Sequence, residues 1–326
     1  MCVGYKTIVM LRLLINANAK RYASFVKNDD CINRIDICLV IVKIKRMPVT
    51  SNESCSWVTL ICNDEYLVGV LALIRSLKRS ETIYPICVLI VENNVSSETV
   101  KQIQNEGAAI RLIEGLHPKQ DAQNLAFARL SFAWTKLRAF EITDIADKCV
   151  FLDSDAIVLN NLDDIFQLED NPDFAAVQTC ICNPEKRPNY PQHWKPSNCP
   201  YTNDIRPENI DPQFRQFNSG LFLYHPSKKL FEEMLGYLNT WDLNQFPFSD
   251  QDFLNKFYKN KWKCLPSFYN SLKTFSLTHP NIWNLSKIKV IHYILAKPWD
   301  KHDPGNQRYD HINYLWWNAL EYQPAS

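Results

Sequence analysis

Two carboxylates with one residue between them, Asp153 and Asp155, follow the apolar run of KCVFLD (148–153). Such a run is typical of a buried parallel strand, and open α/β sheets bind their ligands at the carboxyl ends of these strands. The two carboxylates would repel each other unless a cation compensates their charge. A hard divalent ion with oxygen ligands meets that need, so this D-x-D pattern predicts a metal site. A solvated turn is the alternative, because D-x-D also arises by chance.

A histidine and a lysine stand five residues apart in KVIHYILAKPW (289–299). Neutral imidazole is a common ligand for borderline metals such as manganese, although a histidine that ends a strand is more often a core residue, so His292 has two interpretations. Lys297, next to Pro298, is either a point-charge clamp for phosphate or an ordinary surface lysine. Together with the two aspartates and a divalent ion, this pair would hold a diphosphate as its bond to a sugar breaks.

Glycine is scarce, because only seven of the 326 residues are glycine and they are widely spaced. P-loops and dinucleotide-binding fingerprints both need closely spaced glycines, so the sequence excludes both. Any phosphate must therefore be held without a glycine cradle, and the metal, histidine and lysine described above would do so.

From Ser56 onward, apolar runs alternate with segments of helical periodicity. This β-α-β-α-β order predicts a parallel sheet with helices on its faces, in one domain over 56–326. Residues 1–55 show no clean period and are expected to be an extension outside the core, with Met47 as an alternative start. A polar, proline-rich loop is expected over 183–212. The expected strands are 56–62, 86–91, 109–114, 148–153, 217–226 and 287–293. The expected helices are 66–80, 97–105, one that contains 134–142, 227–239 and 249–258. An Asn63-Asp64 cap is expected before the first of these helices, and Ser96 or Ser97 is expected to cap the second.

The balance of 36 basic and 35 acidic residues leaves a charge of +1, which argues against a nucleic-acid or anionic-membrane partner. No apolar run reaches the about 18 residues of a membrane span, and we expect no signal peptide. The eleven cysteines form no C-x-x-C and are expected to be reduced, mostly buried thiols of a cytoplasmic protein. Cys180, Cys182 and Cys199 could supply three thiolates to zinc, but C-x-C departs from the usual zinc-knuckle spacing, so buried thiols are the favoured interpretation.

Several ordered blocks over 56–300 resemble glycosyltransferase family 8, the glycogenin and galactinol synthase group. WVTLICNDEYLVGVLALIRSL resembles the family's nucleotide-binding strand and helix, and FLDSDAIVLNNLDDIF its D-x-D strand. FNSGLFLYHPS, DQDFLN and VIHYILAKPW resemble three later blocks. The segments QDFLN and THPNIWNLSKIKVIHY favour the galactinol synthase branch.

The resemblance implies a GT-A type, Rossmann-like α/β/α sandwich with a mostly parallel sheet, and a retaining, manganese-dependent transfer from a UDP-sugar that needs no protein nucleophile. Taken singly, each site residue could instead be an ordinary core, capping or surface residue. By position, the resemblance implies manganese binding by Asp153, Asp155 and His292, a uridine pocket of Leu60, Cys62, Asn63 and Tyr66, a sugar or diphosphate contact from Lys136, donor or acceptor contacts from Asn218 and Ser219, hexose contacts from Asp250 and Gln251, and diphosphate binding by Lys297.

Two departures from the family pattern bear on function. The family usually has a glycine between the histidine and K-P-W, and residues 293–296 here have none. No tyrosine matches the self-glucosylated residue of glycogenin, since SLKTFSL (271–277) lacks one, so self-priming is disfavoured. We expect a hexosyltransferase acting on an acceptor hydroxyl, with myo-inositol as the first acceptor to test. The alternatives are a glycogenin-like, glycan- or protein-directed hexosyl- or N-acetylglucosaminyltransferase, an inactive nucleotide-sugar-binding protein, and an interaction module. A homodimer is left open.

Overall fold

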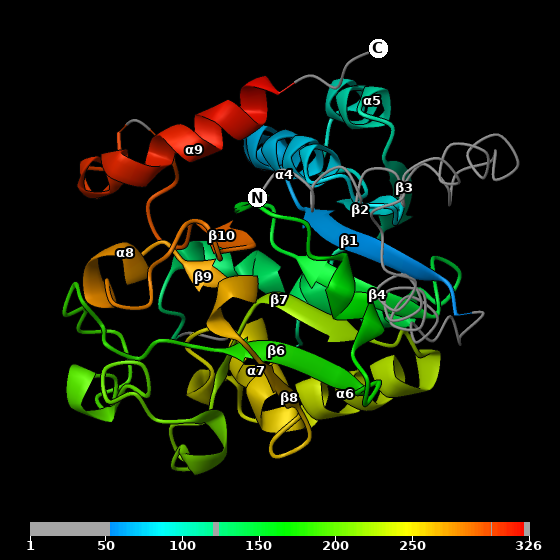
Figure 1. Ribbon diagram of the computed structural model, residues 1–326. Helices are drawn as coiled ribbons and strands as arrows, with labels where there is room; N and C mark the ends of the chain where they lie inside the picture. Colours follow the sequence, from blue (N-terminus) through cyan, green and yellow to red (C-terminus); the bar gives the residue numbers. More distant parts are fainter. Residues whose placement is uncertain (1–52, 120–123, 301, 323–326) are drawn as a thin grey trace, which may run out of the picture. The chain divides into compact units, whose positions relative to one another are not determined.

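A seven-stranded, mostly parallel sheet forms the centre of the fold (Figure 1). The computed structural model describes residues 53–119, 124–300 and 302–322. The chain divides into the units Met1–Asn52 and Glu53–Ser326. The extension expected over 1–55 lies, up to residue 52 and including Met47, outside the described residues.

The strand order is β3-β2-β1-β4-β7-β6-β8, and β7 runs antiparallel to both of its neighbours. Every residue of β2 and β4 is buried, as near-continuous apolar runs covered on both faces should be. The sequence indicated β1, β2, β3, β4 and β7 but not the short β6 and β8. The strands are β1 (Cys55–Ile61), β2 (Ile86–Val91), β3 (Ala109–Ile113), β4 (Lys148–Leu152), β6 (Phe174–Gln178), β7 (Phe217–Tyr224) and β8 (Lys263–Leu265).

Helices cover both faces of this sheet, which confirms the predicted α/β/α sandwich (Figure 1). Apolar side chains of α4 pack with β1 and β2 in one core, and those of α6 and α7 pack with β4 and β7 in the other. The α-helices are α4 (Leu67–Arg79), α5 (Ser97–Asn105), α6 (Lys228–Thr240), α7 (Asp250–Phe257), α8 (Phe275–Thr278) and α9 (Asp310–Glu321), and α9 packs beside α4. None of the described helices is long and apolar enough to cross a membrane.

A second, three-stranded sheet consists of β5 (Ala156–Val158), β10 (Val290–His292) and β9 (Ser271–Leu272). The strand expected over 287–293 is therefore shorter and lies outside the central sheet. β10 runs antiparallel to β5 and places His292 opposite Ala156. This pairing brings the histidine to the turn that contains both aspartates.

Four local predictions can be compared with the backbone. Ser96 caps α5, since its side chain accepts a hydrogen bond from the Thr99 amide, as expected. Asn63 does not cap a helix by its side chain; a short 3-10 turn, Asp64–Tyr66, precedes α4 instead. The helix expected around 134–142 is a 3-10 helix over Ala128–Glu141. The loop expected over 183–212 is confirmed, because only two short 3-10 turns, Pro196–Asn198 and Pro207–Asn209, interrupt it.

Candidate functional site

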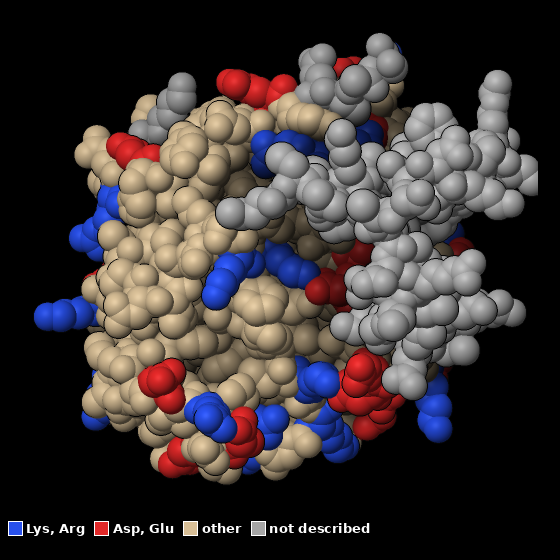
Figure 2. All heavy atoms as spheres, in the orientation of Figure 1, with Lys and Arg blue, Asp and Glu red and all other residues tan. Residues whose placement is uncertain are grey.

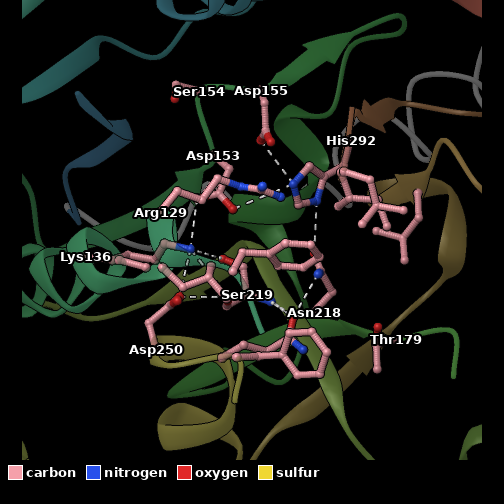
Figure 3. A pocket seen from close by; sticks show the side chains of 18 of the residues that line it. Arg129, Lys136, Asp153, Ser154, Asp155, Thr179, Asn218, Ser219, Asp250 and His292 are labelled. Atoms are coloured by element: carbon pink, nitrogen blue, oxygen red, sulfur yellow. Dashed lines mark hydrogen bonds and ion pairs between the residues drawn. The ribbon is translucent and has the colours of Figure 1, made fainter. Parts of the chain in front are cut away.

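A cavity of about 260 Å³ opens beyond the carboxyl ends of β1 and β4. Figure 2 shows acidic and basic side chains meeting in a hollow on the face viewed, and Figure 3 shows the cavity at close range. The structure brings every site residue named from the sequence to this one cavity: Leu60, Cys62, Asn63, Tyr66, Lys136, Asp153, Asp155, Asn218, Ser219, Asp250, Gln251, His292 and Lys297.

The turn that carries the two aspartates is fixed by backbone hydrogen bonds. The Asp153 amide donates to the carbonyl of Gly220 in β7 over 2.9 Å. The Ala156 amide donates to the Asp153 carbonyl over 3.1 Å, and the Tyr293 amide donates to the Asp155 carbonyl over 2.9 Å. The carboxylates are therefore held between the central sheet and the small sheet.

His292 faces both carboxylates through one ring nitrogen. Its Nε2 lies 3.1 Å from Asp155 Oδ1 and 3.7 Å from Asp153 Oδ2. Its Nδ1 lies 3.0 Å from Asn218 Oδ1, an oxygen that already accepts the Gly220 amide over 3.0 Å. Because that oxygen is an acceptor, Nδ1 donates to it, and Nε2 would be the atom that coordinates an ion bound between the carboxylates. Two oxygens and a nitrogen in this arrangement fit a divalent ion such as manganese.

Two of the scarce glycines lie against this cluster. A Cβ on Gly220 would overlap the His292 ring and come within 2.9 Å of Asn218 Oδ1. A Cβ on Gly69, in α4, would overlap the carbonyl oxygen of Ser154. Glycine is thus required here for close packing around the metal-ligand candidates rather than for a phosphate-binding loop.

The two aspartates experience different electrostatic surroundings. Burial alone would raise the pKa of Asp155, but the Lys297 ammonium, together with the neighbouring imidazole of His292, outweighs burial and holds that pKa well below its usual value. Burial raises the pKa of Asp153 more than the Lys136 ammonium lowers it, and repulsion from Asp155 raises it further. Asp153 is therefore the less well compensated of the two carboxylates, and a bound cation would stabilise its charged form.

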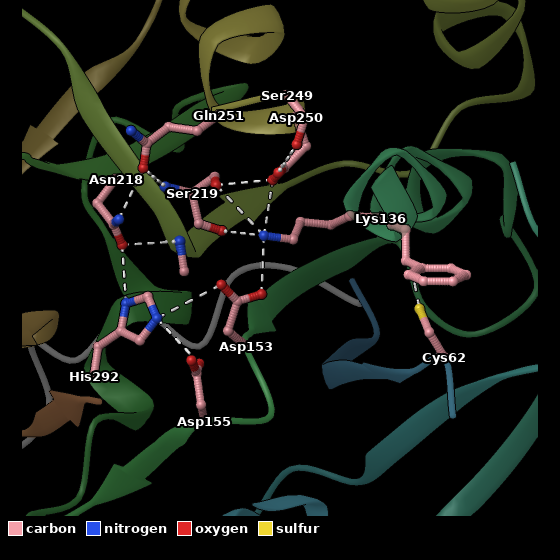
Figure 4. A network of polar contacts seen from close by, with 12 residues as sticks. Cys62, Lys136, Asp153, Asp155, Asn218, Ser219, Ser249, Asp250, Gln251 and His292 are labelled. Atoms are coloured by element: carbon pink, nitrogen blue, oxygen red, sulfur yellow. Dashed lines mark hydrogen bonds and ion pairs between the residues drawn. The ribbon is translucent and has the colours of Figure 1, made fainter. Parts of the chain in front are cut away.

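A buried ammonium links the aspartate turn to α7 (Figure 4). Lys136 Nζ lies 2.9 Å from Asp153 Oδ1 and 2.8 Å from Asp250 Oδ2. Burial would lower the pKa of Lys136, but the carboxylates of Asp153 and Asp250 raise it above its usual value, so the lysine stays charged. Ser219 Oγ donates to Asp250 Oδ2 over 2.8 Å, and Asn218 Nδ2 donates to Gln251 Oε1 over 2.8 Å. Asp250 is the first residue of α7, and Ser249 holds the N-cap position, so Asp250 is no N-cap. Its carboxylate accepts a hydrogen bond from Ser249 Oγ over 3.3 Å, and its contacts with Lys136 and Ser219 are made across the cavity.

The sequence model of Glycosyl transferase family 8 matches residues 57–303. This chain belongs to that family. It is 32% identical to galactinol synthase 2 of Solanum lycopersicum, over 76% of this chain and 73% of that protein. It is 30% identical to galactinol synthase 1 of Arabidopsis thaliana, over 84% and 81% of the two chains. Family membership implies a nucleotide-sugar donor and an acceptor.

Two solved structures share the fold of this family 8 glycosyltransferase. The galactosyltransferase LgtC, solved with donor and acceptor sugar analogs, superposes with a TM-score of 0.50 at 17% identity and covers 82% of this chain and 97% of its own. The WbbM bifunctional glycosyltransferase superposes with a TM-score of 0.56 at 19% identity over 84% of this chain. The family 8 chain spans only about half of WbbM, 51% of its length.

The loop after β10 in this family 8 glycosyltransferase differs from the expected pattern in a visible way. Leu295 has a φ of 66°, in the left-handed region that favours glycine. Lys297 pairs with Asp155 and donates to the Tyr293 carbonyl over 3.0 Å. Lys273, fully buried below the loop, donates to the Ala296 carbonyl. The loop therefore reaches its path without glycine, at the cost of a strained residue.

Arg129 is a cavity residue of this glycosyltransferase that the sequence analysis missed (Figure 3). It lies seven residues before Lys136 in the same 3-10 helix. Burial lowers the pKa of Lys297, Asp155 opposes that effect, and the Arg129 guanidinium lowers it further. Its position in the same helix as Lys136 was the available signal, but a single arginine has no spacing that separates it from a surface residue.

Proposed function

We propose that this family 8 enzyme transfers a hexosyl group from a UDP-sugar to an acceptor hydroxyl with retention of configuration, and that it requires Mn²⁺. The observation that carries the proposal is the meeting of Asp153, Asp155 and His292 in one cavity with the lysines Lys136 and Lys297. These three side chains would hold the ion. When bound, Mn²⁺ supplies positive charge against the leaving diphosphate.

The lysine on the strained loop gives the diphosphate a second cation. Lys297 reaches Asp155 across the cavity, so its ammonium is already held at the metal end. An ammonium is a compact point charge that suits a phosphate oxygen. Lys297 would therefore stabilise negative charge on the leaving group without glycine-rich backbone.

The buried network around Lys136 suits a sugar. Ser219, Asn218, Gln251 and Asp250 present hydroxyl, amide and carboxylate groups in one part of the cavity. Asp250 pairs with Lys136 and accepts a hydrogen bond from Ser219, and both contacts reduce its nucleophilicity. It would bind hexose hydroxyls and stabilise the transition state rather than form a covalent bond, as expected for front-face return.

The remaining end of the cavity suits a uracil base. Leu60, Cys62 and Tyr66 provide largely apolar walls there. Asn63 Oδ1 is buried and has no hydrogen-bond partner among the described residues. A buried acceptor without a partner is costly, and the imide N–H of uracil would satisfy it.

The acceptor we propose is myo-inositol with UDP-galactose as the donor, which rests on the similarity to galactinol synthases. The test is a screen of UDP-galactose, UDP-glucose and UDP-N-acetylglucosamine against myo-inositol, other polyols and oligosaccharides, with and without Mn²⁺. We expect Mn²⁺-dependent transfer to myo-inositol with an α-linked product by NMR. Transfer to a glycan alone would overturn the acceptor, and absence of turnover with every donor would overturn the enzyme proposal.

The metal assignment has its own control. Asp155→Asn keeps the size of the side chain and removes its charge, so Mn²⁺-dependent turnover should fall by at least about 100-fold. Full activity in that variant would contradict the assignment of Asp155.

A further inference from the structure

Four side chains with soft or borderline ligand atoms meet in a second cluster, apart from the aspartate turn. Cys180, Cys182, Cys199 and His279 are all buried, and their ligand atoms all lie within 4.8 Å of one another. The three cysteines come from the long segment between β6 and β7, and the histidine directly follows α8. The activity proposed above does not use them.

The distances match tetrahedral coordination. A tetrahedral zinc with bond lengths of about 2.3 Å to sulfur and about 2.0 Å to nitrogen separates two sulfurs by about 3.8 Å, and a sulfur from a nitrogen by about 3.5 Å. Cys180 Sγ and Cys199 Sγ lie 3.8 Å apart. His279 Nε2 lies 3.1, 3.5 and 3.7 Å from the sulfurs of Cys180, Cys182 and Cys199.

Ordinary buried thiols explain this arrangement poorly. One imidazole nitrogen makes one good hydrogen bond, yet three sulfurs surround this one. A disulfide between Cys180 and Cys199 would need the sulfurs at about 2.05 Å, and the eight cysteines that the structure describes are all free. The Cys182 amide also points at Cys180 Sγ over 3.4 Å, a contact that stabilises a thiolate.

We propose that Cys180, Cys182, Cys199 and His279 bind a structural zinc ion. A closed Cys₃His set leaves no open position, which is the mark of a structural rather than a catalytic zinc site. The sequence alone disfavoured a zinc site, because C-x-C is an unusual spacing for zinc ligands and the fourth ligand lies 80 residues after Cys199. Only the fold brings His279 to the three thiols.

The zinc ion would stabilise one wall of the cavity in which we propose that the sugar binds. The segment between β6 and β7 has almost no regular structure, and it contributes Thr179, Cys180, Asn183 and Trp194 to the cavity lining. A zinc ion would fasten this segment at both Cys180 and Cys199 to the chain after α8. The closed loop would then keep a defined shape without strands or helices of its own.

The test measures metal content in the full chain, produced in zinc-supplemented medium and freed of any histidine tag. We expect about one zinc per chain by plasma mass spectrometry, and loss of most of it in Cys199→Ser and His279→Gln. The matched control is Cys264→Ser, because Cys264 is a partly buried thiol in β8 outside the cluster. That control and Asp155→Asn should retain their zinc, which separates this site from the manganese site.

Wild-type protein gives a second readout, in case the ligand variants fail to fold. Titration with a mercurial reagent should release one zinc as three thiols react, and exchange with Co²⁺ should give the thiolate-to-metal absorption of a tetrahedral site. Wild-type protein without bound zinc, zinc retained in both ligand variants, or a Cys180–Cys199 disulfide in the mass spectrum would each overturn the proposal. None of these outcomes depends on whether the chain transfers a sugar.

Discussion

Replacing Gly220 with alanine adds a single methyl group at the point where β7 meets His292. That methyl would overlap ring atoms of His292 and lie 2.9 Å from Asn218 Oδ1. The ring cannot retreat easily, because it is buried and its neighbours belong to two sheets. We therefore expect the ring to lose its hydrogen bond to Asn218, and its Nε2 to move out of its position next to the two carboxylates.

The expected magnitudes follow from the two effects of that displacement. Forcing a methyl group into a closely packed region costs about 1–3 kcal/mol in free energy of unfolding. Loss of the partner that orients a ligating histidine weakens metal binding by about 10–100-fold. The structure also provides a matched control, since a Cβ on Gly236, exposed in α6, meets no atom within 4 Å. Gly236→Ala should stabilise the protein by about 0.5–1 kcal/mol through helix propensity.

The assay compares the three proteins by calorimetric Mn²⁺ titration and by urea denaturation. Gly220→Ala should lose both Mn²⁺ affinity and stability, whereas Gly236→Ala should keep the affinity and gain stability. Wild-type Mn²⁺ affinity in Gly220→Ala would refute the role given to the glycine and to the histidine it faces. Equal losses in both variants would show that the effect is not local to the site.

Three further predictions test the surroundings of the cavity. Because Leu295 has a φ of 66°, the free energy of unfolding should be about 0.5–1 kcal/mol higher for Leu295→Gly than for Leu295→Ala, although alanine is ordinarily the more stabilising of the two residues. A more stable alanine variant in urea denaturation would contradict this. Burial lowers the pKa of Lys273 to about 7, so above pH 7 the unfolded chain binds a proton that the folded chain lacks. The unfolding free energy of wild type relative to Lys273→Met should therefore rise by about 1.4 kcal/mol per pH unit between pH 7 and pH 10, and parallel pH profiles would exclude it. Lys136→Met should lower the free energy of unfolding by about 3–5 kcal/mol, because two carboxylates lose their cation. The double variant Lys136→Met/Asp250→Asn should recover part of that loss in urea denaturation, and a double variant as unstable as the single one would contradict the shared ion pair.

The sequence predicted the parts of the fold that rest on local pattern. Continuous apolar runs located β2 and β4, and the aspartate pair at the end of β4 located the cavity. The small sheet was only partly predictable, because β5 and β9 are too short to show a period. The pairing of β5 with β10 is set by long-range packing, so the sequence could name His292 without showing that it faces Asp155.

The charges in the cavity indicate why a protein with few glycines would need a cation to bind a diphosphate. Three carboxylates, those of Asp153, Asp155 and Asp250, share the cavity with three cations, the ammonium groups of Lys136 and Lys297 and the guanidinium of Arg129. The charged side chains of the cavity therefore balance, and the two negative charges of a nucleotide diphosphate would leave an excess of negative charge. In a P-loop, backbone amides freed by glycine supply the favourable dipoles. Here one lysine is shared by two carboxylates and the other is paired with Asp155, so neither lysine offsets the charge of a diphosphate by itself. A divalent ion between Asp153 and Asp155 would offset the two negative charges of the diphosphate, and we therefore propose that metal binding is a condition of donor binding rather than an addition to it.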